Sequence, residues 1–195
     1  MDRNDLQKFI DKNGIQATIL PMKIHTPTVE DAARALEVET SQIIKSLVFH
    51  IDGTPLLVIN NGLDRVDRRK LAAYLKVGRK RVKFAAPDQV FDYTGFIVGS
   101  MPPFGHKQKM RTLVDPAVSR QEVIYGGGGD IDAMLRLTSA ELLAAGNKAV
   151  DKSREGDIKF ALELFAVINA GGGHNIVIGD DGRIVYDNDG GGYGG

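Results

Sequence analysis

Residues 43–60 of the chain have the sequence IIKSLVFHIDGTPLLVIN, and this stretch decides the fold. Aliphatic and aromatic side chains fill most of positions 45–51 and 56–60, a composition typical of β-strands. Between the two runs lies Asp52-Gly53, a dipeptide that favours a tight two-residue turn because such turns need left-handed backbone angles. The stretch therefore predicts an antiparallel β-hairpin.

Short helices and short strands alternate on both sides of this hairpin. Two helix starts carry capping-box patterns, Thr28 with Asp31 and Thr138 with Glu141. The expected helices are residues 2–12, 28–36, 67–75 and 87–91, a turn from Thr40 to Ile44 that Thr40 caps, and a last helix after Thr138. The expected strands beyond the hairpin are 15–20, a basic strand around Val82, 94–99, 112–114, 122–125 and 134–137. This mixture indicates an α/β or α+β fold with a mixed sheet.

The composition changes after Gly146. Residues 147–157 are polar and charged, as in a linker, and residues 158–170 are apolar enough for a helix. Residues 176–186 predict two strands about Asp181-Gly182, and residues 190–195 are nearly all glycine. We therefore expect one domain over residues 1–146, followed by a linker, an accessory helix and hairpin, and a Gly-rich tail of unknown role over residues 147–195.

The composition excludes several classes of chemistry. The 195 residues include no cysteine, which excludes disulfides, thiolate nucleophiles and cysteine-bound zinc. The four histidines show no paired metal-ligand spacing, so we expect no metal and no cofactor. No apolar run approaches the roughly 18 residues of a membrane span, and the charged N-terminus has no secretory apolar region. These features favour a cytoplasmic protein.

A net charge of zero hides an uneven distribution. Residues 151–195 hold 8 acidic and 4 basic side chains, whereas residues 1–150 hold 17 and 21. Nine Lys and Arg residues fall between Arg65 and Lys83, opposed only by Asp64 and Asp67, and Arg68, Arg69 and Lys70 are consecutive. Such a cluster is either a phosphate-binding surface or the solvated face of ordinary helices and strands.

Two further features have a functional and a structural interpretation. Lys45 opens an apolar strand, where a lone cation is unexpected. Its stem could lie along the core while its ammonium reaches water, or the ammonium could meet a phosphate in a cleft. The run Gly126 to Gly129 could likewise approach a phosphate or form a wide turn.

The loop Ser100-Met101-Pro102-Pro103-Phe104-Gly105-His106 follows the strand expected at 94–99. Consecutive prolines fix the backbone and cannot extend a strand ladder, so this loop should be rigid. Gly-x-Ser-x-Gly, His-Glu-x-x-His and Walker signatures are absent. The residues alone therefore name no nucleophile.

The ordered motifs resemble one known family. TPTVEDAARALEVETSQIIKSLVF (26–49), RVDRRKL (65–71), TGFIVGSMPPFGH (94–106) and TLVDPAV (112–118) occur in the order and spacing of the YbaK/EbsC family. IYGGGGD (124–130) and RLTSAELL (136–143) resemble its closing segment. The resemblance covers about residues 14–146 and implies a single YbaK-like domain, with a mixed sheet or partly closed barrel flanked by short helices.

Members of that family are free-standing relatives of the prolyl-tRNA synthetase editing domain. The resemblance implies a trans-editing hydrolase that cleaves the ester of a mischarged aminoacyl-tRNA, with a synthetase as a possible partner. Lys45 matches a lysine that meets the terminal phosphate, and Gly99 and Pro103 bound a Gly-x-x-x-Pro loop whose backbone frames the ester. The residues expected to bind substrate are Ser100, Met101, Pro102, Gly105, His106, Asp115 and Gly127, and those expected to attract tRNA are Arg68, Arg69 and Lys70.

Two departures from the family pattern bear on this interpretation. Pro102 stands where many relatives carry serine, and residues 151–195 lie outside the pattern. A fold does not by itself confer activity. The alternative is a catalytically silent YbaK-like module that binds RNA or nucleotides, or accompanies a synthetase.

Overall fold

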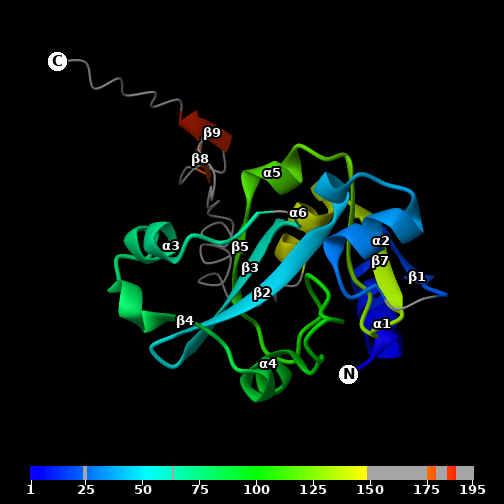
Figure 1. The fold of residues 1–195 in the computed structure, drawn as a ribbon, viewed down its shortest axis with the longest axis horizontal. Coiled ribbons are helices and arrows are strands. Elements are labelled where there is room, and N and C mark those ends of the chain that lie inside the picture. The colour runs from blue at the N-terminus through cyan, green and yellow to red at the C-terminus, as the bar shows by residue number, and fades with distance from the viewer. Residues whose placement is uncertain (24–25, 63, 149–174, 179–183, 188–195) are drawn as a thin grey trace.

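The computed structural model describes residues 1–23, 26–62, 64–148, 175–178 and 184–187 (Figure 1). The helices are α1 (Arg3–Asn13), α2 (Val29–Leu36), α3 (Arg68–Tyr74), α4 (Pro87–Thr94), α5 (Pro116–Ser119) and α6 (Ser139–Lys148), with short 3-10 helices η1 (Thr40–Gln42) and η2 (Arg79–Arg81). The strands are β1 (Ala17–Pro21), β2 (Ile44–Ile51), β3 (Thr54–Asn61), β4 (Val82–Phe84), β5 (Arg111–Val114), β6 (Val123–Gly127), β7 (Ala133–Thr138), β8 (Asn175–Ile178) and β9 (Ile184–Asp187).

The predicted hairpin is confirmed and forms the centre of a four-stranded sheet. β2 and β3 pair antiparallel, with Ile51 opposite Thr54. Asp52 and Gly53 have φ values of 51° and 84°, the left-handed angles that a tight hairpin turn requires. The strand order is β4-β2-β3-β5, and β5 runs parallel to β3. The sheet is therefore mixed, as the sequence predicts.

A second sheet, of three antiparallel strands, has the order β1-β7-β6. A single parallel bridge between Ile43 and Tyr125 connects it to the first sheet, just before β2 begins. The strands in the described part of the chain thus form open sheets and no closed barrel. This agrees with the predicted single mixed α/β domain.

Both faces of the four-stranded sheet are buried, because alternate residues of a strand point to opposite faces. Leu57 and Ile59 of β3 enter the larger core, which α1, α4 and α6 also supply. Leu56 and Val58 enter a smaller core with Leu71 of α3. Figure 1 shows α3 and β4 at one side of the domain and α1 at the other.

The helix ends follow the predicted capping chemistry with one exception. Thr28 accepts a hydrogen bond from the Asp31 backbone N–H, and Thr138 accepts one from that of Glu141. Thr40 was expected to cap a turn reaching Ile44. Instead Glu39 is the capping residue, its N–H donating to the Gln42 side chain, and the turn ends at Gln42 so that Ile44 can begin β2.

The strand predicted at residues 94–99 is wrong. α4 extends beyond the predicted end at residue 91 to Thr94, and Gly95 then ends the helix in a left-handed conformation with φ 77°. The apolar residues Ile97 and Val98 that suggested a strand are 52% and 60% exposed in a turn. No described strand pairs with them. Gly99 therefore lies within a turn and does not end a strand.

The C-terminal strands pair as predicted. β8 and β9 are antiparallel, with Ile176 opposite Tyr186. α6 includes residues 147 and 148, the first two residues of the linker predicted at 147–157. The rest of that linker, the helix expected at 158–170, the turn about Asp181-Gly182 and the Gly-rich end lie outside the described residues. No helix within the described ranges has the length and apolar character needed to cross a lipid bilayer.

Gly127 of β6 packs against the backbone of the loop that follows α4. A Cβ atom at this position would lie 2.4 Å from the carbonyl oxygen of Met101 and 2.7 Å from that of Ser100. Real Cβ atoms do not approach backbone atoms so closely. Glycine at position 127 is therefore needed for the loop and β6 to lie in contact.

We predict that Gly127→Ala destabilises the fold by about 1–3 kcal/mol, the usual cost of overpacking a rigid interior. Gly78→Ala is the matched control, because a Cβ there meets only the Arg81 side chain at 3.8 Å. The control should change the free energy of unfolding by less than about 1 kcal/mol. Urea unfolding followed by circular dichroism measures both, and equal stability of the two variants would contradict the packing argument.

Candidate active site

Three strand ends meet at one edge of the four-stranded sheet. β2 begins where β3 ends, so Lys45 lies opposite Asn60 in the antiparallel register. β5 is parallel to β3, so Asp115, which follows β5, also reaches this edge. The Asp115 backbone N–H donates to the carbonyl of Ile59 at 2.8 Å. The topology thus brings Lys45, Asn60 and Asp115 to one end of the sheet.

Lys45 is held at this edge by main-chain oxygen. Its Nζ donates to the carbonyl oxygen of Asp64 at 3.2 Å. Partial burial lowers the pKa of Lys45, chiefly because it removes water from the ammonium group, while the nearby Asp64 carboxylate opposes this and the Arg65 guanidinium adds to it. The cation therefore lies in a partly dehydrated place where an anionic ligand would interact with it more strongly than in water.

The sequence did not single out Asn60, which the structure places beside Lys45. Asn60 is 1% exposed, and its Nδ2 donates at 2.8 Å to the Asp64 carbonyl that also accepts from Lys45. Its Oδ1 is buried without a hydrogen-bond partner. Buried polar atoms are nearly always paired, so this oxygen marks a place where water or a ligand can complete the contacts. An asparagine ending an apolar strand was the available signal.

Asp115 serves the backbone. Its Oδ1 accepts from the Ala117 backbone N–H at 2.8 Å and so caps α5. Burial raises the pKa of Asp115, with the Asp64 carboxylate adding to the effect and the Ala117 N–H opposing it. Capping of α5 thus gives Asp115 a structural role.

The loop 99–106 presents its backbone rather than reactive side chains. Gly99 has φ 94°, and a Cβ there would meet nothing within 4 Å. The Ser100 side chain is fully buried, and its Oγ donates to the Ile97 carbonyl at 3.1 Å. The Met101 side chain joins the larger core. Space at this loop is therefore open only over Gly99, beside the exposed side chains of Ile97 and Val98.

The glycine run holds this loop against the sheet. The Gly129 N–H donates to the Ser100 carbonyl at 2.9 Å. A Cβ on Gly126 would lie 3.2 Å from Ile44 and 3.7 Å from Pro103. Since Ile44 directly precedes Lys45, this contact joins the loop to the lysine strand. The run is thus a strand end followed by a turn against protein backbone, and nothing in its contacts requires a phosphate.

His106 closes the loop on itself. Its Nε2 lies 2.8 Å from the Pro102 carbonyl oxygen, and since a carbonyl only accepts, Nε2 carries the proton. Burial lowers the pKa of His106 from 6.5 to about 4, although the bond to Pro102 opposes part of this. Gly105 has φ 80° and packs against Phe9 of α1. Gly105 and His106 therefore both make structural contacts within the protein. Their contacts with a substrate stay a prediction.

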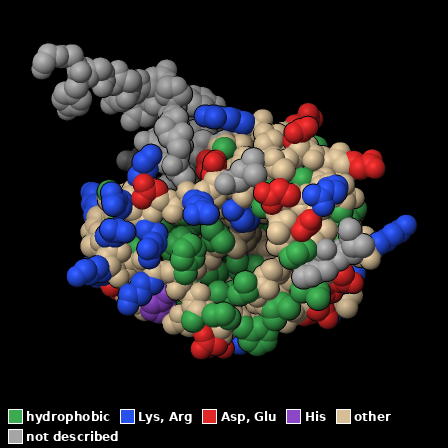
Figure 2. Space-filling view, in the orientation of Figure 1, with side chains coloured by type: hydrophobic (Ala, Val, Ile, Leu, Met, Phe, Trp, Pro, Cys, Tyr) green, Lys and Arg blue, Asp and Glu red, His purple; other side chains and the backbone are tan. Residues whose placement is uncertain are grey.

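Arg68, Arg69 and Lys70 begin α3 and are not part of the sheet-edge group. The Asp67 carboxylate caps that helix by accepting from the Arg69 and Lys70 backbone N–H groups. Figure 2 shows cations gathered over this side of the domain, beside a hollow and a hydrophobic surface near the centre of the same face. Among the described residues, no group of three or more metal-ligating side chains comes together.

Comparison with known proteins identifies the family to which this chain belongs. A family model described as "Aminoacyl-tRNA editing domain" matches residues 24–145, well over half of the chain. The chain belongs to this family. The match includes every residue of the sheet edge and of the loop 99–106, and the resemblance to YbaK-like proteins is thereby confirmed.

Individual relatives agree with the family. The editing domain is 31% identical over 121 residues to the proline--tRNA ligase of Syntrophus aciditrophicus (strain SB), which is 60% of this chain but only 20% of the ligase. It is 28% identical to "Uncharacterized protein YwhH" of Bacillus subtilis (strain 168), over 59% of this chain and 72% of that protein. A solved structure of a candidate trans-editing enzyme for prolyl tRNA synthetase superposes with a TM-score of 0.69 and 28% identity, covering 73% of this chain and 90% of that one.

We predict that His106 makes stability sensitive to acid. Above pH 6.5 the ring is neutral in folded and unfolded chains, whereas between pH 6.5 and about 4 only the unfolded chain takes up the proton. Stability from this group is thus lost as pH falls. Between pH 7 and pH 5 the wild type should lose up to about 2 kcal/mol more than His106→Gln in urea unfolding. Parallel losses in the two proteins would refute this.

Proposed function

We propose that the protein hydrolyses the ester between a mismatched amino acid and the terminal adenosine of tRNA, acting in trans on tRNA charged by a synthetase. The observation that carries this proposal is the loop 99–106 of an editing-domain chain, held by buried contacts with open space over Gly99. The catalytically silent module is the alternative that the experiment below must exclude. A cytoplasmic location, where charged tRNA is used, is part of the proposal.

In this proposal the backbone carries the chemistry. An ester is activated by the neighbouring ribose hydroxyl, so a positioned water can attack without a protein nucleophile. Backbone N–H groups aimed at a developing oxyanion are worth about 3 kcal/mol each. Ser100 fits this proposal because its hydroxyl is buried and donates to Ile97. Gly99 and Pro103 then frame the ester, and the contacts of Gly126 to Gly129 hold the frame.

Lys45 supplies the charge in this proposal. Its partly dehydrated ammonium would exchange the weak contact to the Asp64 carbonyl for a phosphate oxygen of the terminal nucleotide. Asn60 keeps the Asp64 carbonyl in place, so the lysine is already aimed before the substrate arrives. Charge-assisted contacts are roughly twice as strong as neutral ones, which favours the exchange.

We predict that the wild-type protein releases amino acid from at least one member of a panel of mischarged tRNAs, and that Lys45→Ala lowers kcat/KM by about 10- to 150-fold. The range corresponds to about 1.5–3 kcal/mol for a hydrogen bond to a charged group. Lys8→Ala is the matched control, because Lys8 on α1 has an exposed side chain that pairs with Asp5 of the same helix. Release of labelled amino acid is the measurement.

The control should retain wild-type turnover. Full activity of a folded Lys45→Ala protein would remove this lysine from the site. Binding of tRNA without release of any amino acid across the panel would instead support the silent module.

We predict that Ser100→Ala retains most of the turnover, whereas Gly99→Val abolishes it by filling the space over the loop. Valine at position 99 also meets a left-handed backbone, so folding must be controlled. Gly53→Val is the matched control, because Gly53 has φ 84° and equally open surroundings in the distant hairpin turn. Single-turnover deacylation and circular dichroism should show similar destabilisation of both valine variants but loss of turnover only at position 99. An inactive Ser100→Ala with an active Gly99→Val would point to a hydroxyl nucleophile.

A further inference from the structure

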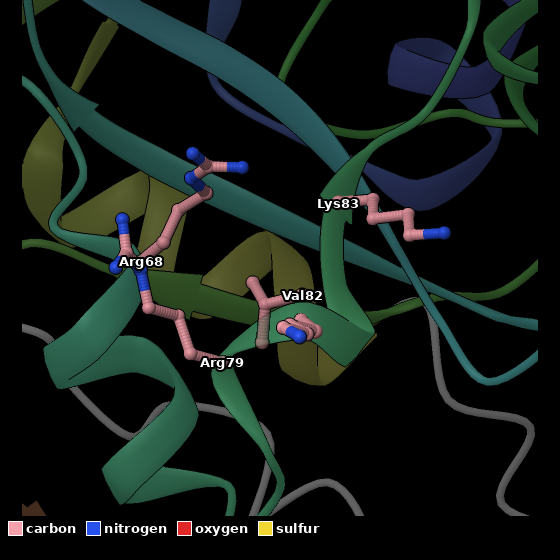
Figure 3. A pocket seen from close by; sticks show the side chains of 5 residues that line it. Arg68, Arg79, Val82 and Lys83 are labelled. Carbon is pink, nitrogen blue, oxygen red and sulfur yellow. The ribbon is translucent and has the colours of Figure 1, made fainter.

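A basic depression lies on the α3 side of the domain, away from the loop 99–106. Its volume is about 470 Å³, and its lining consists of Arg68, Arg79, Lys80, Val82 and Lys83. Figure 3 shows Arg68 extending from the start of α3 and Arg79 reaching up toward the same helix from η2, with Lys83 on the strand beyond Val82. The lining thus combines four cationic residues from three separate elements. In Figure 3 the Lys83 ammonium extends away from the Arg68 and Arg79 guanidinium groups, so Lys83 lies at the rim of the depression.

These four cations have no acidic partner within the described part of the chain. The nearby ion pair is made by Arg81, which binds Asp52 of the hairpin turn and does not line the depression. The Asp67 carboxylate accepts from the α3 backbone. Like charges held together repel one another, so such a cluster favours an anionic ligand that brings several charges at once.

The position of the depression indicates which anion fits. Arg68 lies only four residues after Asp64, whose carbonyl holds Lys45. Four residues span at most about 14 Å, so the depression is within a few nucleotides of the lysine. A nucleic-acid backbone carries one negative charge per nucleotide, so successive phosphates can match several cations grouped near a single-phosphate contact. A lone small anion would leave most of the four cations unmatched.

We propose that this depression binds the phosphate backbone of the tRNA nucleotides preceding the terminal adenosine, and so converts a weak ester hydrolase into one selective for whole tRNA. This inference rests on the proposed function. The contact reads charge and backbone shape, since the lining offers cations and one valine. Of the three residues expected from sequence to attract tRNA, only Arg68 lines the depression, whereas Arg79, Lys80 and Lys83 join it from later in the chain.

The test compares two substrates that carry the same amino acid. One is the mischarged tRNA. The other is adenosine 5′-monophosphate with the amino acid esterified to its ribose, which keeps the phosphate for Lys45 and has no further backbone. The variant combines Arg68→Ala, Arg79→Ala, Lys80→Ala and Lys83→Ala. The charge-matched control combines Lys8→Ala, Lys12→Ala, Arg34→Ala and Arg136→Ala, all outside the depression.

The preference for tRNA over the short ester, measured as the ratio of kcat/KM values, should fall at least tenfold in the variant and stay unchanged in the control. Binding of uncharged tRNA should lose about 3 from its logarithmic salt slope, at about 0.7–0.9 per contact. Between 50 and 200 mM salt, wild-type affinity should thus fall about 50- to 150-fold more than that of the variant.

Equal losses in the control would show a general charge effect and overturn the inference. An equal fall for both substrates would place the four residues in the ester site and also overturn it. If the wild type cleaves neither substrate, the proposed function fails, whereas the salt slope with uncharged tRNA still decides the depression. An unchanged slope in the variant would refute tRNA binding there whatever the activity.

Discussion

The absence of side chains on Gly126 and Gly127 is the constraint on which the candidate site depends. At these positions β6 lies so close to the loop 99–106 that a Cβ on Gly127 would overlap the Met101 carbonyl. The same strand end touches Ile44 and Pro103, and thereby sets the loop against the start of β2. Because interiors transmit strain rather than absorb it, a bulkier residue here would displace the loop relative to the sheet edge.

The polar side chains around this contact mainly form hydrogen bonds with backbone groups of residues 97–106 and of α5. Ser100 donates to a carbonyl of its own turn, His106 donates to Pro102, and Asp115 caps a short helix. Each of these side chains is of a type that elsewhere serves as nucleophile, base or acid, yet each has a structural partner here. For the proposed hydrolysis, a backbone held in this way would have its N–H donors oriented before the substrate arrives, the arrangement that stabilises developing charge most effectively.

The mixed topology of the four-stranded sheet brings the cationic side chain of Lys45 to the end of the sheet at which Gly126 joins the loop 99–106 to β2. β2 starts at the edge where β3 and β5 end, so Lys45, Asn60 and the Asp64 carbonyl come together without any sequence motif linking them. The chain then passes directly into α3 and the basic depression. The proposed ester site and the proposed phosphate-binding surface thus both use residues of the segment 60–83, together with Lys45. The loop 99–106 reaches the start of β2 through Gly126, which lies close to both Ile44 and Pro103.

Local sequence determined the features whose causes are local. The Asp52-Gly53 turn, the caps at Thr28 and Thr138, and the ordered family motifs were all predicted, because turn angles and capping bonds involve neighbouring residues. The apolar residues Phe96 to Val98 suggested a strand, since alternation and composition cannot reveal whether a partner strand exists.

Tertiary structure alone decided the rest. Asn60 acquires a role only through its register opposite Lys45, and Arg68 meets Arg79 only because η2 and β4 fold back beside α3. The conformation at Gly99 was likewise decided beyond its immediate neighbours: Gly95 ends α4 in a left-handed conformation, and the chain after it forms no strand and packs against β6 as a loop. Long-range pairing and burial are properties of the assembled chain, so a single sequence predicts the types of its elements better than the neighbours each will meet.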